Sequence, residues 1–209
     1  MVSLIGSLSG CHKTTKNFLT VFGTDLKTST GKSAFQLVAA DTDLTDFTAF
    51  MKDRDRYEDT LSWLQKNPAV GYNGTTVKVE KVLRQSRFIV LNYSYRDVLR
   101  SAKYSDGCFS YETKDFEIDL ANLDYHLNAI MAELTELTAD TVLACCALFD
   151  IYADNLSGSY VSRFNETISG KCREYKFRYL DVSQIRPLNG GLDEAEVQQA
   201  AATIKRGLS

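Results

Sequence analysis

Residues 16–40 read KNFLTVFGTDLKTSTGKSAFQLVAA, and this stretch decides which fold class the sequence predicts. Apolar, β-branched and aromatic residues dominate Lys16–Asp25 and again Ser33–Ala40, a composition typical of β-strands. The residues between the two runs, Thr28–Lys32, favour a tight turn. The stretch therefore predicts a β-hairpin, which makes the first connection antiparallel.

Helical spacing begins directly after this hairpin. From Asp41 to Leu64 apolar residues recur every three or four positions, which predicts an amphipathic helix that ends before Pro68. The stripe Leu120–Leu137 predicts a second helix. Residues 141–154 are apolar on nearly every side, so they predict a helix buried in the interior or at a subunit interface. Further elements are predicted as strands at 75–83, 86–95, 109–119 and 174–181, and as a terminal helix capped by Asp193.

Successive strands in this pattern are joined mostly by turns rather than by crossover helices. The sequence therefore predicts an α+β fold with a mainly antiparallel sheet, a helix after the first hairpin, a central-to-late helical pair and a short C-terminal helix. Arg186–Gly191 contains Pro, Asn and two Gly and is the clearest boundary. We therefore expect one α+β domain at residues 1–186 and a Gly-hinged helical tail at 187–209.

Composition limits the class of protein. The chain has 209 residues, 44% hydrophobic and 24% charged, which is typical of a soluble globular protein with its own core. It contains no run of about 20 apolar residues and no recognisable secretory signal at the start, so we expect no membrane span and a cytoplasmic location. Five cysteines at irregular spacing predict buried reduced thiols rather than disulfides or zinc ligands: Cys11, Cys108, Cys145, Cys146 and Cys172.

Two short patterns suggest chemistry. Thr30–Ser33 matches the end of a phosphate-binding loop, but Leu26 stands where the first glycine is needed, and the residues after Ser33 favour a strand over the required helix. On a strand, Asp115, Glu117 and Asp119 would share one face and could bind a divalent cation. A solvated outer face opposite Phe116 and Ile118 explains the same alternation, so this motif supports only an alternative function, a metal-dependent nuclease or hydrolase.

Few histidines are available for catalysis or metal binding, because the chain contains only His12 and His126. His126 falls within a predicted helix, and His12 lies in a Ser- and Gly-rich stretch that is a poor platform for a positioned catalytic group. No nucleophile-elbow sequence accompanies either residue. The sequence therefore favours a protein that is not an enzyme, and we assign no catalytic residue, no metal ligand and no cofactor.

Charge is distributed unevenly along the chain. Residues 77–104 carry a net charge of +5 and residues 105–154 a net charge of −10, although the whole chain carries only −3. Basic strands can neutralise phosphates, and opposite charges on different surfaces can direct self-association. The candidate nucleic-acid contacts are Lys81, Arg84, Arg87, Arg96, Lys176 and Arg178.

These observations together predict a non-catalytic structural or assembly protein of the coat or nucleoprotein type. We expect it to form homo-oligomers and to contact RNA or single-stranded DNA through its basic strands. The metal-dependent hydrolase and a protein-binding adaptor are the alternatives.

Overall fold

The computed structural model describes residues 16–50, 57–72, 74–98, 103–105, 108–110, 116–138, 140–148, 158–185 and 192–209. Its centre is a five-stranded sheet in the order β2-β1-β5-β8-β9, and every neighbouring pair is parallel. The prediction of a mainly antiparallel α+β fold is wrong, because helices connect the strands of the main sheet and return the chain to the same edge each time. The strands are β1 (Phe18–Gly23), β2 (Thr45–Phe50), β5 (Ser86–Asn92), β8 (Val142–Cys146) and β9 (Arg178–Leu180).

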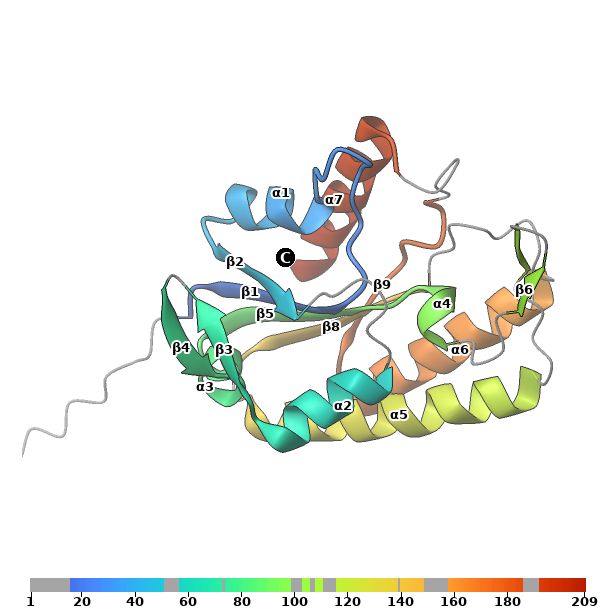
Figure 1. Cartoon of the computed structure of the whole chain (residues 1–209), viewed down its shortest axis with the longest axis horizontal. Helices are drawn as coiled ribbons and strands as arrows, with labels where there is room; N and C mark the ends of the chain where they lie inside the picture. The colour runs from blue at the N-terminus through green and yellow to red at the C-terminus, as the bar shows by residue number, and fades with distance from the viewer. Residues whose placement is uncertain are drawn as a thin grey trace, which may run out of the picture.

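Helices cover both faces of this sheet, so the fold is a three-layer α/β arrangement (Figure 1). On one face lie α1 (Ala34–Asp41) and α7 (Glu194–Leu208), which pack against a core of their own. The other face carries α2 (Tyr57–Lys66), α3 (Val79–Arg84), α5 (Phe116–Leu137) and α6 (Gly158–Tyr175). Three smaller features complete the description: α4 (Tyr95–Val98) after β5, and the antiparallel pairs β3 (Ala69–Tyr72) with β4 (Thr75–Lys78) and β6 (Lys103–Ser105) with β7 (Cys108–Ser110).

The predicted first hairpin is a strand followed by a helix. β1 confirms the strand within 16–25, but residues 34–41 form α1. Ser33 caps this helix, because its hydroxyl accepts hydrogen bonds from the backbone N–H groups of Phe35 and Gln36. Three alanines within α1 also favour a helix over a strand. Residues 18–41 therefore form a strand, a loop and a helix in this order, whereas the sequence predicted a second strand after the loop.

The predicted all-round apolar helix at 141–154 is also wrong, since residues 142–146 form strand β8. β8 lies between β5 and β9, and side chains on both of its faces are buried. A parallel strand covered on both faces gives the same continuous apolar run as a buried helix.

Other predicted boundaries changed as well. The predicted helix at 41–64 contains both β2 and α2, the predicted strand at 75–83 contains β4 and α3, and the stretch 174–181 contains the end of α6 as well as β9. Strand β5 and helices α5 and α7 are confirmed, including the cap at Asp193, which forms a capping box with Glu196.

Helix α7 is tied to the start of the fold. Lys205 Nζ lies 2.9 Å from Asp41 Oδ2, and Lys32 Nζ lies 3.2 Å from Glu194 Oε2. The predicted hinge at 187–191 lies outside the described residues, so the division into a domain and a tail stays a prediction. No helix in the described part of the chain is both long and apolar enough to cross a membrane.

The thiols of β8 and α6 give a direct test of this core. Cys145, Cys146 and Cys172 are buried and reduced. A hydrogen bond with Cys172 and burial raise the pKa of the Cys145 thiol, and burial raises the pKa of Cys146. Because the thiolate is the reactive form, we expect no more than two of the five cysteines to react with Ellman's reagent in the folded protein. All five should react in denaturant; a third fast-reacting thiol in the folded state would contradict the placement of β8.

Candidate functional site

The order of the strands singles out one edge of the sheet. The chain passes from β1 to β2 on one side and later adds β5 on the other side of β1. In open parallel sheets, ligands bind at the carboxyl ends of strands where the order reverses in this way. The carboxyl ends of β1 and β5 are therefore the first place to look for a functional site.

Gly23 lets these two strand ends approach closely. Its φ is +99°, and a Cβ there would lie 2.1 Å from the Asn92 carbonyl oxygen, so no other residue fits without moving the backbone. The Thr24 N–H donates to that oxygen at 2.7 Å, and the Asn92 side-chain amide donates to the Thr24 carbonyl at 2.5 Å. Asn92 is completely buried, so these hydrogen bonds are shielded from water.

Asp97 fixes the same junction from helix α4. Its carboxylate is 5% exposed, and Oδ2 accepts three hydrogen bonds. The Thr24 hydroxyl donates at 2.8 Å, the Ser94 N–H at 2.6 Å and the Ser94 hydroxyl at 3.0 Å. Three donors on one oxygen stabilise the carboxylate in this position.

Asp25 is the second carboxylate at this edge, directly after Thr24. Its side chain is half-buried, and Oδ1 accepts a hydrogen bond from the Ser33 hydroxyl at 2.7 Å. The same Ser33 oxygen caps α1, so the carboxylate lies beside the positive end of that helix. Asp25 is thus positioned by a hydroxyl and keeps some contact with solvent, which are the properties of a group that can accept a proton from water.

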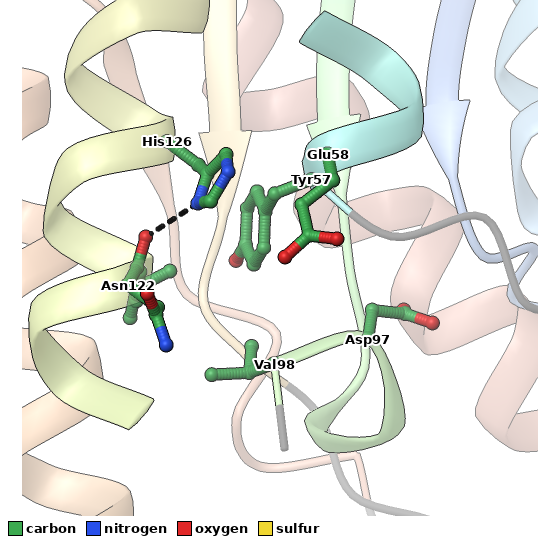
Figure 2. Close-up of a pocket in the computed structure, with 7 residues that line it drawn as sticks. Tyr57, Glu58, Asp97, Val98, Asn122 and His126 are labelled. Carbon is green, nitrogen blue, oxygen red and sulfur yellow. Dashed lines mark hydrogen bonds between the residues drawn. The ribbon is translucent and has the colours of Figure 1, made fainter. Parts of the chain in front are cut away.

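A small cavity adjoins Asp97 on the side of α2 and α5. Figure 2 shows residues that line it: Tyr57 and Glu58 of α2, Asp97 and Val98 of α4, and Asn122 and His126 of α5. Its volume is about 10 Å³, enough for one water molecule. His126 Nδ1 donates to the Asn122 carbonyl at 2.8 Å. Asp25 does not line this cavity.

The six basic residues predicted from the sequence come from separate elements. Lys81 and Arg84 of α3 line one surface depression, whereas Arg87 lies on β5, Lys176 in the turn after α6 and Arg178 on β9. Arg96 belongs to α4, and its side chain lies outside the described residues. Arg84 pairs with Glu80 at 2.8 Å, and Arg178 donates to the Gly207 carbonyl at 2.9 Å. A role for these residues in nucleic-acid contact stays a prediction.

The predicted carboxylate face at 115–119 does not form. Asp115 lies outside the described residues, and Glu117 and Asp119 belong to the first turn of α5 rather than to a strand. Two residues apart on a helix they point to different sides: Glu117 is exposed and Asp119 is buried. A hydrogen bond from Arg163, at 2.6 Å, lowers the pKa of Glu117. Among the described residues no three His, Cys, Asp or Glu side chains gather in a way that could hold a metal ion.

The residues at the β1–β5 edge were not identified from the sequence. Thr24 and Asp25 directly follow the apolar strand β1, whereas Asn92 is the last residue of β5 and Asp97 lies in α4, which follows β5. Polar residues at the ends of two apolar strands can be recognised in the sequence. They form one site only because the two strands are parallel and end at the same edge of the sheet.

Comparison with known proteins identifies the fold. No family model and no curated protein matches the chain. Among solved structures, a protein from Desulfitobacterium hafniense described as lipolytic and of the G-D-S-L family aligns over 91% of this chain and 99% of its own, with a TM-score of 0.61 and 9% identity. A lipase/acylhydrolase from Enterococcus faecalis aligns over 91% and 94%, with a TM-score of 0.62 and 11% identity. An acetyl xylan esterase aligns over 92% and 100%, with a TM-score of 0.64 and 11% identity.

These likenesses overturn the predicted coat or nucleoprotein role, because the aligned proteins are described as lipolytic proteins, lipases and esterases. Nothing in them supports the capsid or RNA-binding interpretation. Because only 9–11% of the aligned residues are identical, these likenesses establish the fold and do not establish the activity or the site residues. The chain has the fold of these ester-cleaving proteins.

Proposed function

We propose that this protein is a hydrolase of ester bonds and that its active site is the carboxyl edge of β1 and β5. The observation that carries the proposal is the position of Asp25. It is a half-buried carboxylate held by the Ser33 hydroxyl at the strand end where the order of the sheet reverses. The ester-cleaving activities named for the structural neighbours support the class of reaction.

A comparison with the name of the G-D-S-L family refines the mechanism. Residues 23–26 of this chain read Gly-Thr-Asp-Leu, so Gly and Leu agree and Asp25 stands where that name has serine. A carboxylate is a poor covalent nucleophile for an acyl group, since the product would be an anhydride. It can instead act as a general base on water. The water oxygen attacks the ester carbon and its proton passes to Asp25. The C–O bond to the alcohol then breaks, and protonated Asp25 gives the proton to the departing oxygen, so that the acid and the alcohol are released and Asp25 is ionised again.

Asp97 has a different role in this mechanism. Its carboxylate already accepts three hydrogen bonds, so it holds Thr24 and Ser94 in place rather than exchanging protons. The Thr24 hydroxyl is the competing nucleophile. It donates to Asp97 Oδ2, which already accepts two hydrogen bonds from Ser94, so we favour water activated by Asp25.

Exchange of Asp25 for its amide tests the proposal. We expect Asp25→Asn to lower kcat/KM for p-nitrophenyl acetate by about 100-fold or more, because an amide cannot accept the proton. The matched control is Asp43→Asn at an exposed carboxylate, which should keep the wild-type rate. Thr24→Val separates the two mechanisms: it should reduce the rate by less than about tenfold. If Thr24→Val abolishes hydrolysis and Asp25→Asn preserves it, the assignment of the base is wrong.

A further inference from the structure

A surface groove lies between α6 and the edge strand β9. Its volume is about 520 Å³, within the range of about 300–1,000 Å³ that is usual for ligand sites. Helix α6 contributes one wall, Tyr179 of β9 lies between, and the turn after β9 supplies Ser183 and Gln184. None of these side chains belongs to the polar cluster at the β1–β5 edge.

The lining of the groove is polar but carries no net charge. It contains one carboxylate, Glu166, and one guanidinium, Arg173; the remaining polar groups are hydroxyls and amides. Among the lining residues, Val161 has an apolar side chain and Tyr179, which is half-buried, has an aromatic ring; carbon atoms of the polar residues add further apolar surface. An occupant of this groove therefore needs many hydrogen-bonding groups, no net charge and one face that can pack on an aromatic ring.

Several of these polar groups are already held in position. The Asn165 side-chain oxygen accepts the Leu148 N–H at 2.8 Å, which leaves its amide N–H groups to donate elsewhere. The Ser162 hydroxyl donates to Glu166 at 3.1 Å. Within the described part of the chain, the side chains of Arg173 and Gln184 make no hydrogen bond or ion pair. Asn165 therefore offers amide donors in a fixed orientation, and Arg173 and Gln184 have hydrogen-bonding groups available to a ligand.

An acyl chain does not suit this lining. A methylene group gains about 0.8 kcal/mol only when it is transferred from water to apolar surroundings. Here it would remove water from Ser, Asn, Glu and Arg side chains and offer no hydrogen bond in return, which costs free energy. A sugar ring has hydroxyls on its rim and C–H groups on its faces, and it matches both the polar wall and the Tyr179 ring.

The position of the groove connects it to the proposed active site. Ser183 and Gln184 follow the carboxyl end of β9, and Asn165 accepts a hydrogen bond from Leu148, two residues after β8, so the groove reaches the same edge of the sheet as Asp25. β9 is three strands away from β1, which at about 4.8 Å per strand is about 14 Å. Two to three linked sugar rings span such a distance.

From this chemistry and position we infer that the groove between α6 and β9 binds a neutral oligosaccharide, and that the ester cleaved at Asp25 is carried on a sugar. The second half of this inference rests on the proposed function. The first half, binding in the groove, does not depend on hydrolysis and can be tested separately.

Binding is measured on the Asp25→Asn variant, so that turnover cannot interfere. The probes are neutral trisaccharides, namely xylotriose, cellotriose and maltotriose, with octanoate as the acyl-chain competitor, followed by calorimetry and amide chemical shifts. We expect at least one trisaccharide to bind and to shift amides of residues 161–173 and 183–184, and octanoate to leave them unchanged. Binding of none of the three sugars, or occupation of the groove by octanoate, would overturn the inference.

Variants then locate the contact. Arg173→Gln and Gln184→Ala should each weaken sugar binding by about tenfold, the loss expected for one good hydrogen bond to a ligand. Arg206→Gln, at an exposed arginine of α7, is the matched control and should leave affinity unchanged. Equal affinity in all three variants would place the sugar elsewhere. Sugar binding that survives while Asp25→Asn retains full esterase activity would refute the proposed function alone.

Discussion

Gly23→Ala is expected to destabilise the protein by about 4 kcal/mol or more, one of the two largest effects of a single substitution in this structure. The left-handed φ of +99° costs an alanine about 1–2 kcal/mol. The new Cβ would also lie 2.1 Å from the Asn92 carbonyl oxygen and 2.8 Å from the Tyr93 ring. The carbonyl belongs to the central strand pair, so it cannot move without breaking the β1–β5 junction. Urea unfolding measures the loss as a lower midpoint.

Gly170→Ala is the matched control. Gly170 lies inside α6, and a Cβ there meets nothing within 4 Å. Because alanine is the better helix former, this variant should be more stable than the wild type by about 0.5–1 kcal/mol. If the two variants unfold at the same urea concentration, the close approach of β1 and β5 is not a feature of the folded protein.

Asp97→Ala is the second large effect, with an expected loss of about 3–5 kcal/mol. The substitution removes the acceptor for the Thr24 hydroxyl and for both donors of Ser94, in a region that water does not reach freely. Each buried donor left without a partner adds to the cost. Asp97→Asn keeps one oxygen that can accept, so it should lose less, about 1–3 kcal/mol. Thermal and urea unfolding of the three proteins give the order.

Asp41→Asn provides the comparison for Asp97. This carboxylate also has a partner, Lys205 at 2.9 Å, but it lies on the surface, 61% exposed. Its exchange should therefore change stability by less than about 1 kcal/mol. The outcome that contradicts the structure is an Asp97→Ala protein as stable as Asp41→Asn.

Helix α5 shows what the sequence could predict about the fold. It is amphipathic, with one buried side formed by residues such as Leu127, Ile130 and Leu134, so its apolar spacing identifies a helix directly. β8 has no such signal, because both of its faces are covered and its apolar residues are continuous. Because residues 142–146 were predicted as part of a helix, the predicted sheet lacks the strand that pairs with β5 and β9.

The site was missed for a related reason. Asn92 donates to the carbonyl of Thr24 across 68 positions of sequence, and neither residue forms a motif with its own neighbours. The two strand ends meet only because β1 and β5 are parallel. Once residues 33–40 were assigned to the second strand of a hairpin, the sheet became antiparallel and the ends of successive strands fell on opposite edges. Asp25 was therefore missed because the predicted strand directions were wrong, although the sequence around it was apolar as expected for a strand end.

The link between α7 and α1 has a consequence for how the protein is made. Asp41 and its partner Lys205 are 164 positions apart in the sequence. The apolar side of α1, with Phe35 and Val38, is covered by α7 side chains such as Ile204. During translation this surface stays in water until α7 has left the ribosome. The nascent chain can complete the α5 side of its sheet earlier, so the layer formed by α1 and α7 closes after it, and the apolar side of α1 is a surface that chaperones can shield until then.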